Sequence, residues 1–360
     1  MGLPSMADSQ NSSGGFSLLG LFRRPEAGAA AGFILIFLFF AYFGLDKNFL
    51  TALGTSTWLN FASKVGIVAI PIGFLMIAGE LDISIGAVIP AGGIALAIGT
   101  ELYGMNIWVA FAMSMVICGF IGFVNGMIVT RTKVPSLIVT LATLFVVAGL
   151  NAYVSKGLAG TTQHSLQDVG VVSEFILGDY HTLAFGEGSD KVTIFRSLQS
   201  SFFLFLLVSA LGFFILHKSP WGNWIFALGG DQESARNAGI PTSSLKIVLF
   251  MLSAMAAGLV GMTEAVLANT ASTTTQFGMI FNSIICVVVG GVLLTGGFGT
   301  VTGTVFGTLT FGIVFQGINF TTFDKDLNML FIGVLLLVAV LMNDTFRNWA
   351  TRASTGKKSS

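Results

Sequence analysis

Three carboxylates stand beside or within long apolar runs, and these residue types can do chemistry there. Glu80 and Asp82 lie between two such runs, and Glu264 lies near the end of another. A charge in apolar surroundings is costly unless it faces water or a partner group. One interpretation is that the three groups line or gate a polar path. The alternative is local: Asp82 or Ser84 caps the next helix, and Glu264 reaches a polar interface.

Amide side chains also occur inside the apolar runs. Asn125 and Gln316 join the candidate path, and the other amides of this kind are Asn151, Asn282 and Asn319. Amides and carboxylates can donate and accept hydrogen bonds as a polyhydroxylated solute requires. Hydrogen bonds between helices are the commoner use of such residues, so both interpretations stay open.

A different pattern lies in the polar stretch 218–245, where the residues around Asp231 predict a short helix over roughly 232–238. Asp231 is a good N-cap, and an acidic residue such as Glu233 is favourable in the first turn. Gly239 can end the helix, and the proline two residues later prevents its continuation.

This short helix combines features that suit docking onto another protein. Ser234, Ala235 and Ala238 are small enough for close approach, and Glu233 and Arg236 carry charges that could orient a partner. An ordinary loop helix that docks nothing has the same features, so the residues by themselves leave both hypotheses open.

Several kinds of chemistry are disfavoured. The glycine-rich stretch 290–303 lacks the Gly-Lys-Ser/Thr ending of a phosphate-binding loop. The histidines and cysteines do not have metal-ligand spacing, and no spacing in the sequence indicates a catalytic nucleophile with its base. The net charge of zero gives no sign of a nucleic-acid partner. We therefore expect a protein that is not an enzyme, with no catalytic site, cofactor or metal.

The composition predicts that these residues are held by helices in a lipid bilayer. Only 9% of the 360 residues are charged, 54% are hydrophobic, and 45 are glycine. A soluble domain usually carries about 25% charged residues. So few charges cannot cover a water-facing surface, and small residues allow close helix packing in membranes.

Hydrophobic runs of roughly 20 residues predict an all-α, polytopic fold of about ten transmembrane helices. With both termini cytoplasmic, more lysines and arginines fall on the inner side than on the outer side, where Lys64 is counted. The expected spans are 27–45, 61–79, 83–100, 107–129, 136–155, 199–217, 246–268, 279–295, 300–319 and 327–343. The short connections 78–84 and 294–300 can be cytoplasmic turns or breaks inside the membrane.

The predicted domain organisation is a single membrane domain between two tails. Residues 1–26 form a cytoplasmic tail, 27–345 the membrane domain and 346–360 a second cytoplasmic tail. The domain includes an outer loop over 156–198, where we expect a short interfacial helix, and the inner loop 218–245. No stretch is left for a nucleotide-hydrolysing domain.

Four blocks of the sequence resemble motifs of ABC transporter permeases of the ribose/xylose/arabinose type. Glu233-x-Ala235-x-x-x-Gly239 looks like the signature loop that contacts the ATPase subunit in that family. The other blocks are Ala78-Gly-Glu-Leu-Asp-Ile-Ser-Ile-Gly86, the stretch 134–143 and the stretch 290–304. The resemblance covers about 30–345. Glu80 departs from it, standing where the family usually has a small residue, and Phe298 stands where a basic residue is common.

The resemblance implies a permease subunit in the cell inner membrane that takes up a monosaccharide or polyol. It implies an ATP-binding subunit docking on 230–241, a periplasmic sugar-binding protein, and a second permease copy or paralogue. It makes Asp231, Glu233, Ala235, Arg236 and Gly239 the ATPase-coupling residues. An ion-coupled secondary transporter using intramembrane carboxylates is the main alternative, and a structural or receptor-like membrane protein is a third.

Overall fold

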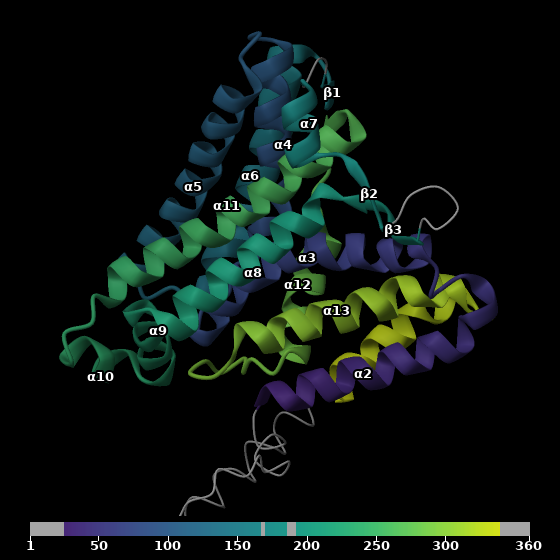
Figure 1. Cartoon of the computed structure of the whole chain (residues 1–360). Helices are drawn as coiled ribbons and strands as arrows, with labels where there is room; N and C mark the ends of the chain where they lie inside the picture. Colours follow the sequence, from purple (N-terminus) through teal and green to yellow (C-terminus); the bar gives the residue numbers. More distant parts are fainter. Residues whose placement is uncertain (1–24, 167–169, 186–191, 339–360) are drawn as a thin grey trace, which may run out of the picture.

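Long helices make up most of the described chain and are joined by breaks and loops. The computed structural model describes residues 25–166, 170–185 and 192–338 (Figure 1). The longer helices are α2 (Pro25–Phe43), α3 (Ala52–Ile77), α4 (Ile85–Glu101), α5 (Ile107–Arg131), α6 (Ser136–Ala159), α8 (Ser200–Lys218), α11 (Thr242–Ala268), α12 (Phe277–Val289) and α13 (Val301–Gly317). Helical backbone also occupies 328–338, at the end of the described residues.

Shorter elements occupy the two ends of this bundle. They are the helices α7 (Val171–Leu177), α9 (Pro220–Gly230) and α10 (Gln232–Asn237), and the strands β1 (Gln163–Ser165), β2 (Tyr180–Phe185), β3 (Val192–Gln199) and β4 (Thr270–Ser272). Figure 1 shows α9 and α10 at one end of the long helices and α7, β1 and β2 toward the other. We call these the α10 end and the hairpin end.

Six of the described helices are long and apolar enough to cross a membrane: α3, α5, α6, α8, α11 and the stretch Val301–Phe320. Three shorter apolar helices accompany them, at Ala27–Phe43, Ile85–Glu101 and Phe277–Val289. The chain is therefore a multi-pass membrane protein, whereas ten crossings are not confirmed. Residues 1–24 of the first predicted tail, the whole second tail and the last part of the predicted span 327–343 lie outside the described residues, whereas residues 25 and 26 begin α2.

The predicted span 279–295 is corrected by the structure. Helix α12 has 13 residues and ends at Val289. At about 1.5 Å of rise per residue it is shorter than a bilayer core of about 30 Å. A glycine-rich stretch without helical backbone follows it up to Thr300. The predicted end of this helix is wrong because the apolar run continues past the point where the glycines end the helix.

The predicted helical fold is confirmed in its main part, and two small antiparallel sheets accompany the helices in the described residues. Strand β1 pairs with β4, with His164 opposite Ala271, and β2 pairs with β3 as a hairpin in the predicted outer loop. These strands are short, and β1 and β4 are far apart in the sequence, so no local periodicity signals their pairing. The short helix expected in this loop is present as α7.

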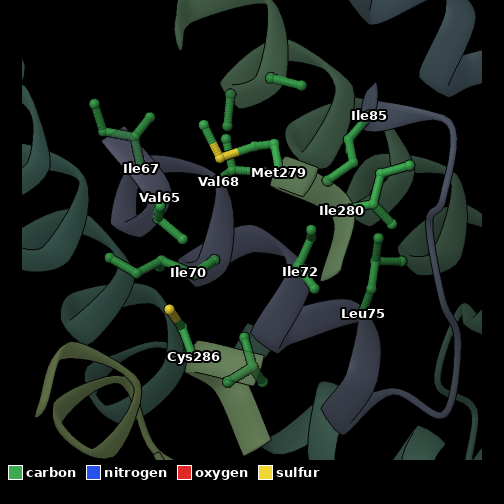
Figure 2. Packing of buried hydrophobic residues seen from close by; sticks show 14 of the residues in the cluster. Val65, Ile67, Val68, Ile70, Ile72, Leu75, Ile85, Met279, Ile280 and Cys286 are labelled. Carbon is green, nitrogen blue, oxygen red and sulfur yellow. The ribbon is translucent and has the colours of Figure 1, made fainter. Parts of the chain in front are cut away.

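Helix α3 is the central element of the core. Nearly all of its residues from Trp58 to Ile77 are buried, and it packs against α8, α11, α12 and α13. Figure 2 shows side chains of α3, among them Val68 and Leu75, beside Ile85 of α4 and Met279 and Ile280 of α12.

Candidate functional site

A cavity of about 470 Å³ lies near the hairpin end between α3, α4, α11 and β4. Its apolar and glycine lining comes mainly from α4 and α11, where Gly93 and Gly261 bring the two backbones together. The polar residues that line it are Lys64, Tyr180, Glu264, Thr270, Ser272, Thr274 and Gln276. A cavity of this size is in the usual range for a small-molecule site.

The charged groups of the cavity form a connected polar cluster. Nζ of Lys64 lies 3.6 Å from Oε1 of Glu264, and Nε2 of Gln276 donates a 2.8 Å hydrogen bond to Oε2 of Glu264. The Lys64 and Glu264 side chains are 22% and 28% exposed, so water or a solute can reach both. Lys64 lies inside α3, which corrects its assignment to an outer segment: α3 begins at Ala52, earlier than the apolar run indicated.

This cluster can recognise a small solute that is rich in hydroxyl groups. It presents a carboxylate, an amide, an ammonium group and several hydroxyls within one concave surface, and together these can both donate and accept hydrogen bonds. Among the path candidates from the sequence, only Glu264 lines this cavity.

A hydrogen bond links the cavity lining to the segment where the helical backbone is interrupted between α3 and α4, which we call the break. The backbone N–H of Gln276 donates a 2.8 Å bond to the carbonyl of Gly86, in the first turn of α4. The break itself covers 78–84. Gly79 ends α3 with a φ of +82°, and the N–H of Glu80 donates to the carbonyl of Leu75.

Hydroxyl groups of α6 accept hydrogen bonds from backbone N–H groups of the break. The N–H of Leu81 donates to Oγ of Ser136 at 3.1 Å, and the N–H of Ile83 donates to Oγ1 of Thr140, also at 3.1 Å. Ser136 and Thr140 are one helical turn apart, so a single face of α6 supports the segment. Two of the sequence blocks noted above thus contact each other directly.

Asp82 and Asn125 belong to a buried network beside this break, away from the cavity lining. Oδ1 of Asp82 accepts bonds from the N–H and the hydroxyl of Ser84, at 3.0 and 2.6 Å. Nδ2 of Asn125 donates to Oγ of Ser84 at 2.9 Å, and Oγ1 of Thr143 donates to Oδ1 of Asn125 at 2.6 Å. The network joins the start of α4 to α5 and α6.

Gln316 is also placed away from the cavity. It is half-buried near the end of α13 and accepts a 3.3 Å bond from Asn319. Asn151 of α6 donates a 2.9 Å bond to the carbonyl of Ala87 in α4. These two amides make contacts within the protein.

The predicted helix in the polar stretch is confirmed as α10, with its predicted cap. Oδ1 of Asp231 accepts bonds from the N–H groups of Glu233 and Ser234, at 2.9 and 3.1 Å. These hydrogen bonds, those of Ser234 above all, hold the pKa of the Asp231 carboxyl below its usual range. The preceding helix α9, which begins at Pro220, was not predicted.

The other end of α10 is closed as the sequence indicated. Gly239 has a φ of +84°, and the N–H of Ile240 donates to the carbonyl of Ala235 at 3.1 Å. Ala235 is buried, whereas Glu233 and Arg236 are exposed. Helix α10 therefore attaches to the bundle on one side and presents charges on the other.

Glu80 is placed toward α10. Its Oε1 lies 2.5 Å from Nζ of Lys246 in α11, and the same Nζ donates a 2.7 Å bond to Oε1 of Gln232, the first residue of α10. Sequence reasoning missed Lys246 because its partners are 166 and 14 residues away.

A serine–histidine–carboxylate arrangement that spacing did not reveal lies at the hairpin end. Nε2 of His164 lies 2.5 Å from Oγ of Ser155, and its Nδ1 lies 3.4 Å from Oε2 of Glu101. Ser155 and His164 are 0% and 1% exposed, so a substrate cannot reach the hydroxyl. The contacts attach β1 to α4 and α6.

Comparison with known proteins places the chain among transport permeases. The family described as branched-chain amino acid transport system / permease component matches residues 54–340. The inner membrane ABC transporter permease protein YjfF of Escherichia coli is 30% identical over 280 residues, which are 77% of this chain and 80% of that protein.

Two sugar permeases are similar over most of their length. The L-arabinose ABC transporter permease protein AraH of Azospirillum brasilense is 29% identical, over 88% of each chain. The ribose import permease protein RbsC of Escherichia coli is 27% identical, over 83% of this chain and 88% of the relative. No solved structure matched the chain.

Proposed function

The chain belongs to this family of ABC transporter permeases, among its monosaccharide-type members, and from that membership we propose that it is the membrane subunit of an ATP-driven importer of a monosaccharide or polyol. The polar lining of the cavity is the observation that supports this class of solute. Its carboxylate, amide and hydroxyl groups suit a neutral solute whose hydroxyls need both donors and acceptors.

The energy for transport comes, in this proposal, from a partner ATP-binding subunit that docks on 230–241. The capped helix α10 supports this assignment because its charged side faces outward while Ala235 fixes it to the bundle. ATP binding would draw the α10 helices of two permease copies, or of this chain and a paralogue, toward each other. The cavity would then lose access to one side and gain it on the other.

The sidedness follows from the same assignment. The α10 end faces the cytoplasmic side of the inner membrane, where both termini also lie in this proposal. The hairpin end then faces the periplasm, where a sugar-binding protein delivers solute to the cavity. The more numerous lysines and arginines expected on the inner side support this orientation.

Co-purification in mild detergent tests the proposal. Gly239→Pro places proline at a φ of +84°, which proline cannot adopt, and should release the ATP-binding subunit while the permease stays in the membrane. Gly104→Pro is the matched control, because Gly104 also has a positive φ, of +58°, and open space around it, in the turn after α4.

An ATP-binding subunit that is recovered with the wild type and with Gly104→Pro, but lost with Gly239→Pro, would support the importer. A permease that purifies alone and whose transport stops with a protonophore would overturn it in favour of an ion-coupled secondary transporter. Normal uptake by Gly239→Pro at normal expression would remove the coupling role of α10.

A further inference from the structure

Lys246 is an unusual lysine for a membrane helix because it is almost wholly buried. Its side chain is 8% exposed, and that of its partner Glu80 is 11% exposed. Buried charges are retained only where partners compensate the loss of water. Lys246 has two such partners, Glu80 and Gln232, and they belong to different parts of the chain.

The two partners of Lys246 lie in two different segments, α10 and the break between α3 and α4. Gln232 is the first residue of the six-residue helix α10. Glu80 lies in the break that leads into α4, and Pro90 and Gly93 of α4 line the cavity. A displacement of α10 therefore acts, through one ammonium group, on a segment that is continuous with the cavity wall.

A second attachment nearby has a different character. Gly229 of α9 packs against the carbonyl of Ile77 so closely that a Cβ would collide with it, and the N–H of Gly297 donates a 2.8 Å bond to the same carbonyl. This contact is steric and fixes one arrangement. The buried ion pair, in contrast, joins two flexible side chains by a strong charge interaction, so it can stay intact while the elements move.

We propose that Glu80, Lys246 and Gln232 form a latch that transmits the movement of α10 to the break between α3 and α4. The three are positioning residues, and they touch neither solute nor nucleotide. The latch rests on the proposed function, and it gives a role to Glu80, the residue that departs from the pattern of the family it resembles. It also separates Glu80 from the translocation path.

The test compares uptake with ATP hydrolysis in the complete transporter, reconstituted in lipid vesicles with its ATP-binding subunit and binding protein. Labelled ribose, L-arabinose and fructose are the probes, and the one taken up by the wild type is used. Glu80→Gln should lower the uptake per ATP hydrolysed by about fivefold or more, the lower range of ordinary coupling between sites. Assembly with the ATP-binding subunit should be kept.

Two further variants distinguish a loss of coupling between ATP hydrolysis and uptake from a loss of protein stability. The reversed pair Glu80→Lys/Lys246→Glu should recover uptake per ATP relative to Glu80→Gln, whereas the uncharged pair Glu80→Gln/Lys246→Met should not. Glu101→Gln is the control, since it removes a carboxylate paired with His164 at the hairpin end and lies outside the cavity lining. It should leave the uptake per ATP as in the wild type.

The latch is overturned if the uncharged pair transports with the wild-type ratio of uptake to hydrolysis. The uncharged pair decides the matter even where the single variants do not fold, because it leaves no buried charge unpaired. A wild type that hydrolyses no ATP would overturn the proposed function and the latch with it. A coupled wild type with a coupled uncharged pair would overturn the latch alone.

Discussion

Helix α11 carries one member of a lysine–glutamate pair near each of its ends, and the two pairs are built differently. At the α10 end the glutamate, Glu80, follows α3, and the lysine lies on α11, with 2.5 Å between the charged atoms. At the hairpin end the lysine, Lys64, lies on α3 and Glu264 on α11, with 3.6 Å between them. The first pair is buried, and the second opens onto the cavity.

The difference shows how one kind of contact can serve two purposes. A pair with little water around it interacts strongly but is costly to break, so it suits a fixed connection between elements. A partly exposed pair is weaker and exchanges more easily with water, so its groups remain available to a solute. Packing around each pair decides which property is obtained.

Removing the buried lysine should have the largest effect on stability. In Lys246→Met the Glu80 carboxylate loses its partner, and removal of one partner of a buried pair costs about 3–5 kcal/mol. Lys64→Met at the exposed pair should cost about 1 kcal/mol or less. Thermal unfolding of both variants in detergent measures the difference. Equal shifts in Tm would show that the two pairs are alike.

The glycine contact beside the buried pair should be the next most sensitive position. A Cβ on Gly229 would collide with the backbone of Ile77, whereas one on Gly230 would meet nothing within 4 Å. Gly229→Ala should therefore destabilise the protein by about 1–3 kcal/mol, the usual cost of overpacking. Gly230→Ala is the matched control, measured in the same thermal unfolding experiment, and a similar loss in both variants would contradict the packing described here.

At the exposed pair we expect a change in solute affinity with little change in stability. Glu264→Gln removes the charged acceptor from the cavity, and hydrogen bonds to charged groups contribute about 1.5–3 kcal/mol. The solute concentration for half-maximal uptake should rise about tenfold or more. Gln316→Ala, outside the cavity, should leave that concentration unchanged. The opposite result in these uptake assays would move the solute path toward α13.

The smallest effect should be a pH dependence of α10. The pKa of Asp231 is lowered in the folded protein by its hydrogen bonds to Ser234 and Glu233. The stabilisation is therefore complete above the ordinary pKa of aspartate and is lost as the pH falls through the lowered value. Hydrogen exchange of the Glu233 and Ser234 amides should lose protection in that acidic range.

Asp231→Asn provides the control for this pH dependence. Asparagine is also a good N-cap but does not titrate, so protection of the two amides should stay constant over the same pH range. Loss of protection at the same pH in both proteins would show that another group controls α10.

The parts of the molecule that depend on neighbouring residues were predicted well. Helix α10, its Asp231 cap and its Gly239 end follow from residues within one short stretch, because capping is local. The existence of the long apolar helices follows from hydropathy in the same way. The end of α12 was missed because glycines can either continue a membrane helix or end it, and their neighbours in space decide.

The sequence by itself determined that this chain is a multi-pass membrane protein with a capped helix between two long apolar helices, and its motifs indicated the family. Only the tertiary structure decided where each buried polar group points. Glu264 meets Lys64 and Gln276 at a cavity, whereas Glu80 meets Lys246 beside α10. Both glutamates stand beside apolar runs in the sequence. Their different surroundings arise from contacts between residues far apart in the chain, which composition and spacing do not encode.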